Sequence, residues 1–209
     1  MVVEALKHRM QRRWRARRMQ EFTQRIQLQP RMRIIDLGGL PELWETIDFD
    51  LDITLVNTGS QFSKLSRSYR RTYRTLEADA CDLGQLADGA FDLVFSNSVI
   101  EHVGSPDRQA NFARNVRRLA SQYWVQTPSI WFPIEAHCNL PLWWFYPPWL
   151  QQQWLDRWQR QGKKFKWQQM SHTRVLTLDR LKSLFPGSSV YVESVAGFPK
   201  SYSMYVGDK

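Results

Sequence analysis

The 209-residue sequence has no run of about 18 uninterrupted apolar residues, so it predicts no membrane-spanning helix. Its N-terminus carries charge but no apolar segment of the kind that directs secretion. There are only two cysteines, Cys81 and Cys138, too few for a disulfide framework or a zinc site. These absences predict a reduced, cytoplasmic setting. The hydrophobic share of 43% is enough for the core of one domain.

Acidic residues are scarce in the first 33 positions, which hold ten basic residues and only two acidic ones. Nearly all of the formal net charge of +9 therefore belongs to this segment. Residues 1–29 contain no proline or glycine, and their apolar side chains recur four or eight positions apart, which predicts a basic amphipathic helix. The apolar positions are Leu6, Met10, Trp14, Phe22 and Ile26.

Two interpretations of this N-terminal helix stay open at the level of sequence. In the first, the apolar stripe packs on the rest of the domain and water solvates the arginines. In the second, the basic face contacts an anionic membrane surface or nucleic acid. Under the second interpretation we expect the membrane rather than nucleic acid, and the cytoplasmic protein would then have a peripheral membrane contact.

Short apolar runs alternate with helical patterns from residue 30 onward, as in parallel βαβ units with helices on both faces of a sheet. The runs lie at 33–39, 52–57, 75–83, 91–97, 122–127, 189–195 and 201–206, and the clearest helical patterns at 108–120 and 177–185. The last two runs leave no room for a helix between them, which predicts an antiparallel hairpin. The expected fold is one α/β domain over residues 30–209.

One long segment, at about 128–170, interrupts the alternation. It holds seven of the ten tryptophans and five of the ten prolines. Long insertions after a sheet strand are usually functional, so we expect a lid over the carboxyl ends of the strands. Residues 149–161 have helical apolar spacing. If the tryptophans face a ligand, they favour a flat or apolar one.

Small and polar residues stand where the first four strands end. Ligands of open α/β sheets bind at this edge. The pair Gly38 and Gly39 lets the backbone turn tightly and approach a ligand closely. Asn57 ends the second strand, Asp79 the third, and the stretch 96–98 the fourth. A ligand with hydroxyl and amino groups fits this set of side chains.

The segments IIDLGG, LVN, DACDL and FDLVFSNSVIEHV, at their spacings here, resemble the class I S-adenosylmethionine-dependent methyltransferases. The resemblance covers about residues 31–127. It implies a Rossmann-like seven-stranded sheet in the order 3-2-1-4-5-7-6 with the last strand antiparallel. It also implies S-adenosyl-L-methionine as the cofactor. The cofactor-binding residues that it implies are Asp36, Gly38, Gly39, Asn57, Asp79, Ala80, Ser96 and Asn97.

Each part of that cofactor has an implied place. The loop from Asp36 to Gly39 would lie under the methionine part, with residues 96–97 beside it. Asn57 would bind the ribose, and residues 79–80 would contact the adenine.

The sequence departs from the family pattern in the glycine loop, where Leu40 and Glu42 occupy the last two glycine positions, and at Asn57, where an acid is usual. These departures keep a rival open: a non-catalytic, methyltransferase-like module attached to an anionic membrane or RNA by its basic helix. A nicotinamide-binding domain is disfavoured, because no G-x-G-x-x-G follows the first strand.

Four titratable residues are the candidate catalytic groups. Glu101 and His102 follow the fourth strand, and Glu135 and His137 lie in the loop after the fifth. A hydroxyl acceptor benefits from a general base, and histidine is the usual one near neutral pH. Either histidine could be that base, or the first pair could simply open the next helix. Some relatives bind metal through E-x-x-E-H, but Ser98 replaces the first glutamate here, so no metal is predicted.

The resulting prediction is methyl transfer to a small or lipid-like acceptor, on oxygen. The sequence has no N/D-P-P-Y/F tetrapeptide after the fourth strand, which argues against methylation of a base nitrogen.

Overall fold

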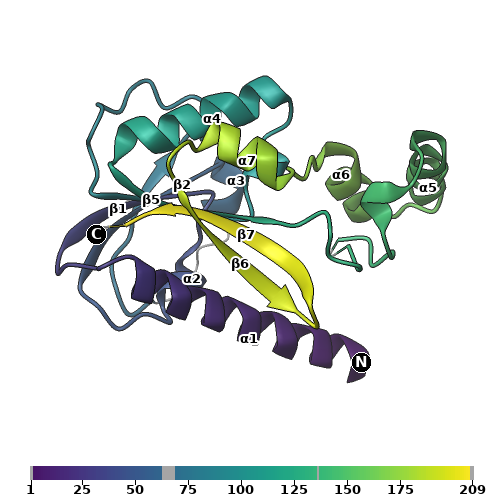
Figure 1. Cartoon of the computed structure of the whole chain (residues 1–209), viewed down its shortest axis with the longest axis horizontal. Helices are drawn as coiled ribbons and strands as arrows, with labels where there is room; N and C mark the ends of the chain where they lie inside the picture. Colours follow the sequence, from purple (N-terminus) through teal and green to yellow (C-terminus); the bar gives the residue numbers. More distant parts are fainter. Residues whose placement is uncertain (1, 63–68, 136, 208–209) are drawn as a thin grey trace.

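The computed structural model describes residues 2–62, 69–135 and 137–207, with the backbone alone described at 2–8, 11 and 60. Its centre is a seven-stranded sheet in the order β3-β2-β1-β4-β5-β7-β6 (Figure 1). Strands β1 to β5 are parallel to one another, whereas β7 is antiparallel to both β5 and β6. The predicted strand order and terminal hairpin are confirmed.

The strands lie close to the predicted apolar runs. They span β1 (Met32–Leu37), β2 (Leu51–Asn57), β3 (Arg74–Glu77), β4 (Leu93–Asn97), β5 (Gln122–Pro128), β6 (Ser189–Val195) and β7 (Phe198–Val206). The largest difference is at β3, which ends before Asp79. The chain turns there, with the Asp82 amide donating to the Asp79 carbonyl at 2.8 Å, so Asp79 lies beyond the strand.

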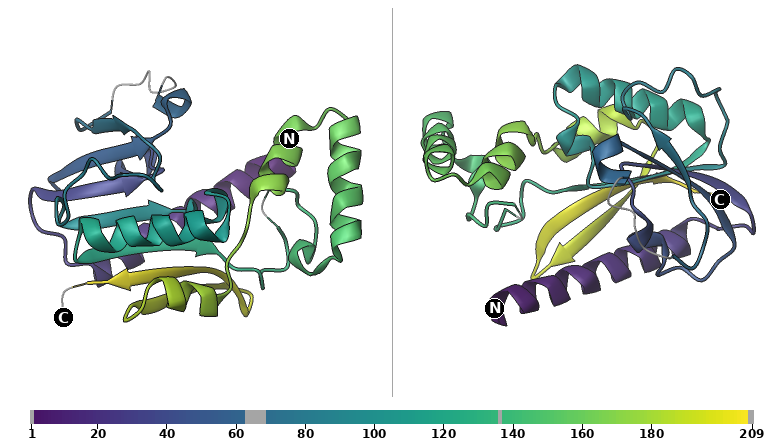
Figure 2. Two further views of the ribbon diagram at one scale, coloured as in Figure 1. Left: turned by 90° about the horizontal axis from the view of Figure 1, so that it is seen from above. Right: turned by 180° about the vertical axis from the view of Figure 1, so that it is seen from behind.

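Helices cover both faces of the sheet (Figures 1 and 2). On one face lie α4 (Pro106–Leu119) and α7 (Leu178–Leu184), and on the other α1 (Val2–Arg25) and the short α2 (Pro41–Trp44). The side chain of Ser105 caps the N-terminus of α4, and Thr177 caps that of α7. Each face buries its own hydrophobic cluster.

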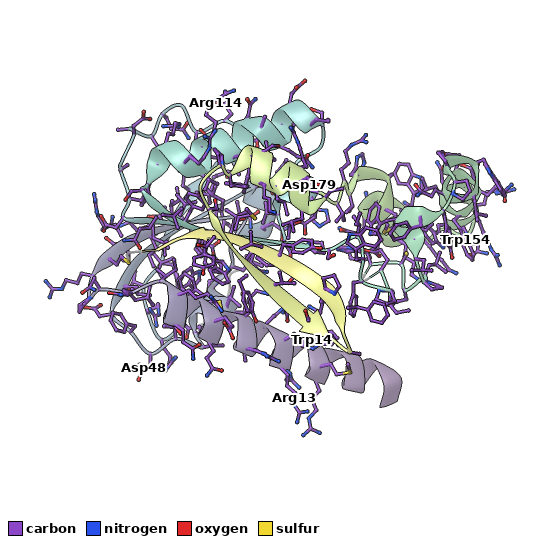
Figure 3. All side chains as sticks on the ribbon, viewed as in Figure 1. Arg13, Trp14, Asp48, Arg114, Trp154 and Asp179 are labelled. Carbon is purple, nitrogen blue, oxygen red and sulfur yellow. The ribbon has the colours of Figure 1, made fainter. Side chains whose placement is uncertain are left out.

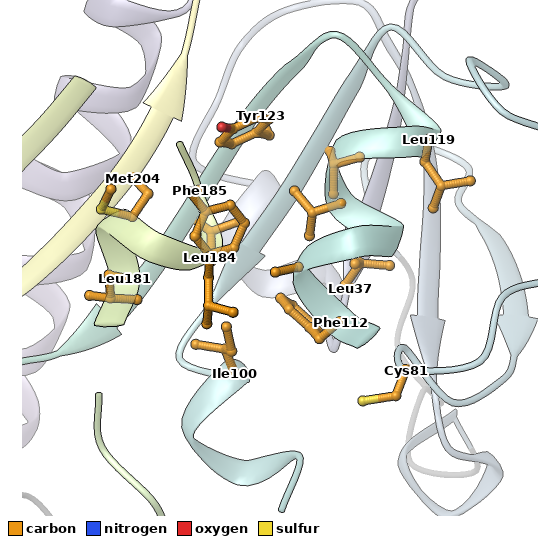
Figure 4. Packing of buried hydrophobic residues seen from close by; sticks show 14 of the residues in the cluster. Leu37, Cys81, Ile100, Phe112, Leu119, Tyr123, Leu181, Leu184, Phe185 and Met204 are labelled. Carbon is orange, nitrogen blue, oxygen red and sulfur yellow. The ribbon is translucent and has the colours of Figure 1, made fainter. Parts of the chain in front are cut away.

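The cluster under α4 and α7 anchors the chain that follows β4. There the 3₁₀ turn η1 (Ile100–His102) begins with a fully buried isoleucine. Figure 4 shows Ile100 packed beside Leu184 and Phe112. Because Ile100 is held in the core, the two residues after it start from a well-defined position.

The N-terminal helix divides into two halves. Phe22 and Ile26 are fully buried against the sheet, so the apolar stripe does pack on the domain at this end. Met10, by contrast, is 40% exposed. Trp14 lies between these extremes, beside the β6–β7 hairpin, with the Lys200 ammonium 4.5 Å from its ring centre (Figure 3). The helix ends at Arg25, four residues short of the predicted 1–29 segment.

The insertion after β5 builds a small cluster of its own. It contains the 3₁₀ turn η2 (Trp143–Phe145), α5 (Pro148–Arg160) and α6 (Lys164–His172), of which the first and last were not predicted. Its buried centre consists of Cys138, Trp143, Trp158 and Met170. In Figure 1 both helices stand to the side of the sheet. Trp143 and Trp154 both pack on Trp158, whereas Trp131 and Trp149 are exposed. The lid stays a prediction.

Candidate functional site

Asp36, the next-to-last residue of β1, is buried among apolar residues. Its carboxylate accepts a 2.7 Å hydrogen bond from Trp44 Nε1, the indole that α2 carries. Burial raises the pKa of Asp36 to about 7, although this hydrogen bond lowers it. A Cβ added at Gly39 would lie 1.9 Å from Asp36 Oδ2, so only glycine fits there. The Asp36 carboxylate thus restricts the conformation of the loop at Gly38 and Gly39.

Gly38 takes the left-handed backbone conformation, with φ of +78°. Asn57 Nδ2 donates to the Gly39 carbonyl at 3.2 Å and so ties the end of β2 to this loop. Beside Asn57 in the register stands Glu77, whose carboxylate lies against Gly59: a Cβ there would meet Glu77 Oε1 at 2.2 Å. No sequence pattern pointed to Glu77, which brings an acid next to the neutral Asn57.

Asp79 is half exposed just beyond β3. Its Oδ1 accepts from the Cys81 amide at 2.9 Å, and its Oδ2 lies 2.6 Å from the Arg108 guanidinium. Burial raises its pKa, but the Arg108 and Cys81 hydrogen bonds outweigh that effect and hold the pKa below the ordinary value. The Ala80 carbonyl accepts from Asn115 Nδ2 at 3.0 Å. Asp79 is therefore an ionised acceptor at the edge of the sheet.

The end of β4 turns its polar side chains into the protein. Ser96 Oγ donates to the Leu37 carbonyl at 3.0 Å. Asn97 Oδ1 accepts from Arg18 of α1 at 2.7 Å. Ser98 has a left-handed φ of +58°, unusual for a residue with a side chain. The side chains of Ser96 and Asn97, both predicted to bind the cofactor, thus already have partners within the protein. A ligand beside Gly38 would therefore meet mainly the backbone of this segment.

Glu101 is fully buried behind this turn. Its Oε2 accepts from Thr127 Oγ1 of β5 at 2.9 Å, while its Oε1 has no hydrogen-bond partner among the described residues. Burial raises the pKa of Glu101 to about 7. Its Oε1 lies 3.9 Å from His102 Nε2. The carboxyl therefore titrates near neutrality beside an imidazole.

His102 is neutral near pH 7, because burial and the charge of His137 lower its pKa to about 4. Its Nδ1 lies 3.1 Å from Thr173 Oγ1, whose proton goes to the Gln169 carbonyl at 2.5 Å. These partners assign the proton to Nδ1 and the lone pair to Nε2. The structure thus holds the tautomer that a base at Nε2 requires. No sequence pattern pointed to Thr173.

The loop after β5 brings the second acid–imidazole pair to the same place. Glu135 accepts from the His137 and Cys138 amides and lies 2.8 Å from His137 Nδ1. Burial raises the pKa of Glu135, but the hydrogen bonds and charge of His137 outweigh it, so the pKa lies below its ordinary value. The rings of His102 and His137 meet edge to face at 5.3 Å. All four predicted catalytic residues form one cluster.

These groups lie at a single edge of the sheet, where the parallel strands β1, β2, β4 and β5 end. The glycine loop and Asp79 lie toward β3, and the four acid–imidazole residues toward β5. No set of three or more histidine, cysteine, aspartate or glutamate residues within the described ranges has the geometry to hold a metal ion. The arrangement suits binding of a ligand beside a base, at the edge where open α/β sheets bind ligands.

The sequence matches the family described as a methyltransferase domain over residues 39–122. No curated protein matches it. The seven-stranded sheet in this order is the Rossmann-like architecture of class I methyltransferases. The family match over residues 39–122 and the order of the sheet thus agree with the resemblance to the class I S-adenosylmethionine-dependent methyltransferases, whose cofactor is S-adenosyl-L-methionine.

Solved structures resemble the chain in fold at low sequence identity. One of them is a chain from a complex between the Haloferax volcanii Trm112 methyltransferase activator and a methyltransferase. The match covers 95% of the present chain and 91% of that one, at 10% identity and a TM-score of 0.57. The present chain spans 57% of the [4+2]-cyclase SpnF, with 84% of its own length, 15% identity and a TM-score of 0.53. It also spans 57% of the Mycobacterium tuberculosis cyclopropane synthase MmaA2, with 79% of its own length, 17% identity and a TM-score of 0.53. A cyclase and a cyclopropane synthase thus share this fold, so the acceptor must be argued from the site.

The residues at this edge fit the cofactor. Gly38, in its left-handed turn, presents backbone without a side chain. Asp79 offers a half-exposed, ionised acceptor for an exocyclic amine. Glu77 and Asn57 stand together at the ends of neighbouring strands, where a ribose would need acceptors.

Proposed function

We propose that the protein transfers a methyl group from S-adenosylmethionine to an oxygen of a small or lipid-like acceptor. The observation that carries this proposal is the cluster of Glu101, His102, Glu135 and His137 beside the glycine loop. When bound, the cofactor supplies a methyl group on a positively charged sulfur. The acceptor oxygen would form its bond to that carbon as the carbon–sulfur bond breaks, with the electron pair of the broken bond left on sulfur.

His102 receives the acceptor's proton at Nε2 in this proposal. The Nδ1 contact to Thr173 holds the ring in the required tautomer. The charges of Glu101, whose Oε1 lies 3.9 Å from Nε2, and of Glu135 stabilise the imidazolium that forms. A base whose pKa is lowered to about 4 is weak, so the proposal favours an acidic hydroxyl such as a phenol. Exposed Trp131 and Phe145, whose rings contact at 5.2 Å, support a flat or apolar acceptor.

The test of the base compares His102→Ala with His137→Ala. The variant that lacks the base should lose about 10²–10⁴ in turnover while its cofactor affinity stays nearly unchanged. If His102 is the base, the rate of the unmodified protein should show no step at the ordinary histidine pKa near 6.5, because the pKa of His102 is about 4. A step near pH 7 would belong to Glu101, whose pKa is about 7, and should be absent in Glu101→Gln. The exposed His172→Ala is the control.

A screen over phenols, quinols, sugars and lipid head groups supplies the acceptor for this test. Full turnover in both histidine variants would refute a histidine base. Methyl transfer would then rest on alignment alone.

The test of the cofactor site uses Asp79→Ala and calorimetric titration with S-adenosylhomocysteine. Loss of an acceptor that leaves a bound amine unpaired should weaken binding by about 1–3 kcal/mol. Asp82→Asn, an exposed carboxyl in the same turn, is the matched control. Wild-type affinity in a folded Asp79→Ala variant would remove Asp79 from the adenine site.

A second function, a non-catalytic module, is favoured by one feature of the glycine loop. Leu40 and Glu42 stand at the last two glycine positions of the family pattern, and α2 already begins at Pro41. Titration with the cofactor and with its demethylated product separates the two functions, since a module that binds neither cannot transfer methyl groups. The basic helix and the proposed lid at 128–170 would serve either function.

A further inference from the structure

Arg18, in the middle of α1, is a buried cation that reaches the edge of the sheet where the site lies. Its side chain is 7% exposed. Its Nη2 donates to Glu193 Oε2 of β6 at 2.7 Å, and its Nη1 donates to Asn97 Oδ1 at 2.7 Å and to Gln126 Oε1 at 3.3 Å. One guanidinium thus joins the N-terminal helix to three strands.

The contact with Gln126 leads on to the turn that opens the catalytic loop. The same Gln126 Oε1 accepts from Ser98 Oγ at 2.8 Å, and the Gln126 carbonyl accepts from the Ser98 amide at 2.9 Å. Ser98 is in the left-handed region, which costs about 1 kcal/mol or more for a residue with a side chain. Such a conformation persists only where its surroundings hold it. Glu101 and His102 follow three and four residues later.

We propose that Arg18 is a positioning residue: through Asn97 and Gln126 it holds the Ser98 turn and thereby aims Glu101 and His102 at the reacting groups. The inference rests on the proposed function, because the loop matters only if that cluster acts in methyl transfer. It makes the N-terminal helix part of the working site.

Stability alone explains Arg18 poorly. A buried ion pair generally gains little over a well-packed apolar pair, because both charges lose their hydration. Glu193 also has other partners, with Ser201 Oγ at 2.7 Å and Lys200 Nζ at 3.4 Å. The two further bonds of Arg18 both go to residues at the site. The charge of Arg18 also opposes the burial that raises the pKa of Glu101.

The experiment separates positioning from stability with a double variant. Arg18→Gln alone removes the ion pair with Glu193 and leaves that carboxylate buried, so this variant should unfold at a lower temperature than the unmodified protein. Adding Glu193→Gln removes that charge and should restore much of the melting temperature. The Ser98 turn leads directly into Val99, which lies against Gly38 of the cofactor loop, so the double variant should still bind S-adenosylhomocysteine about tenfold more weakly. The NMR resonances of the Ser98 amide and the His102 ring should also move. Arg17→Gln, an exposed neighbour, should change none of these.

Arg18→Lys is the second variant, in case the double variant does not fold. A lysine can keep the ion pair with Glu193, but it lacks the fork that reaches Asn97 and Gln126 at once. It should therefore stay folded and show the same loss of affinity and the same resonance changes. Wild-type affinity and unmoved resonances in either folded variant would overturn the inference. If the unmodified protein does not bind S-adenosylhomocysteine, the proposed function fails, and the resonances alone decide the role of Arg18.

Discussion

Asp36 and Glu101 are two buried carboxyls that share the edge of the sheet, and the pKa of each is raised to about 7 by burial. Among the residues that the structure describes, each accepts a hydrogen bond from one side chain, Asp36 from Trp44 and Glu101 from Thr127. One hydrogen bond does not replace the hydration that a carboxylate loses on burial. A change of charge near neutral pH is therefore built into the site.

Glu101 should make the stability of the fold depend on pH in a predictable direction. Its pKa rises from 4.5 to about 7 on folding, so the protonated folded state is favoured below pH 4.5, and this advantage is lost as the pH rises through 7. Relative to Glu101→Gln, the unmodified protein should lose about 3 kcal/mol across that window. Urea unfolding at pH 4.5, 6 and 8 measures the difference.

The comparison with Glu101→Gln isolates this group from His102, whose lowered pKa acts in the opposite direction below about pH 6.5. Asp82→Asn, at an exposed position, should track the unmodified protein at every pH. Parallel stability curves for the unmodified protein and Glu101→Gln would show that Glu101 ionises normally.

Helix α1 is the element whose role differs most along its length. Its C-terminal half belongs to the core: the Phe22 ring lies 5.0 Å from that of Phe95, 5.7 Å from that of Trp124 and 6.0 Å from that of Trp44. Its N-terminal half leaves Met10 40% exposed. Apolar residues at helical spacing thus predict which face of a helix is apolar, but not how much of that face the rest of the protein buries.

Phe22→Ala should destabilise the fold by about 3–5 kcal/mol, the usual cost of removing a fully buried phenylalanine and leaving a cavity. Met10→Ala, on the same stripe of the same helix, should cost far less because its side chain is already partly exposed to water. Denaturant unfolding of both variants measures the contrast. Similar losses in the two variants would mean that the N-terminal half of α1 is covered in solution.

The whole molecule is charged unevenly, because the basic residues of α1 sit on an otherwise nearly neutral chain. None of the described helices is long and apolar enough to cross a membrane. Attraction between the exposed arginines of α1 and anionic lipid would need no spanning segment and would weaken with salt. The membrane contact proposed for this helix can therefore be tested by charge alone.

Replacing Arg12, Arg13 and Arg15 together by glutamine should weaken binding to vesicles of anionic lipid by about 3 kcal/mol, at about 1 kcal/mol for each basic residue near the surface. The matched control replaces three exposed basic residues of α4 and α7, Arg114, Arg117 and Lys182, with the same change of charge. Sedimentation with vesicles at low and high salt measures both. Equal losses would assign any binding to net charge rather than to α1.

Local pattern by itself was sufficient to predict the α/β class, the approximate position of each strand and the antiparallel hairpin. Apolar periodicity and strand-ending residues act within a few positions of each other, so the sequence displays them directly. The strand order came through resemblance to a family. The short helices α2 and α3 (Gly59–Phe62) were not predicted, because four residues are too few to establish a period.

Only the tertiary structure decided which groups meet. Glu101 and His102 follow one strand and Glu135 and His137 another, and the parallel pairing of β4 and β5 brings these four residues together. Arg18, Thr173 and Glu77 carry no local signal, because their partners lie far away along the chain. The pKa values of Asp36, Glu101 and His102 likewise depend on burial, which exists only once the chain has folded around them.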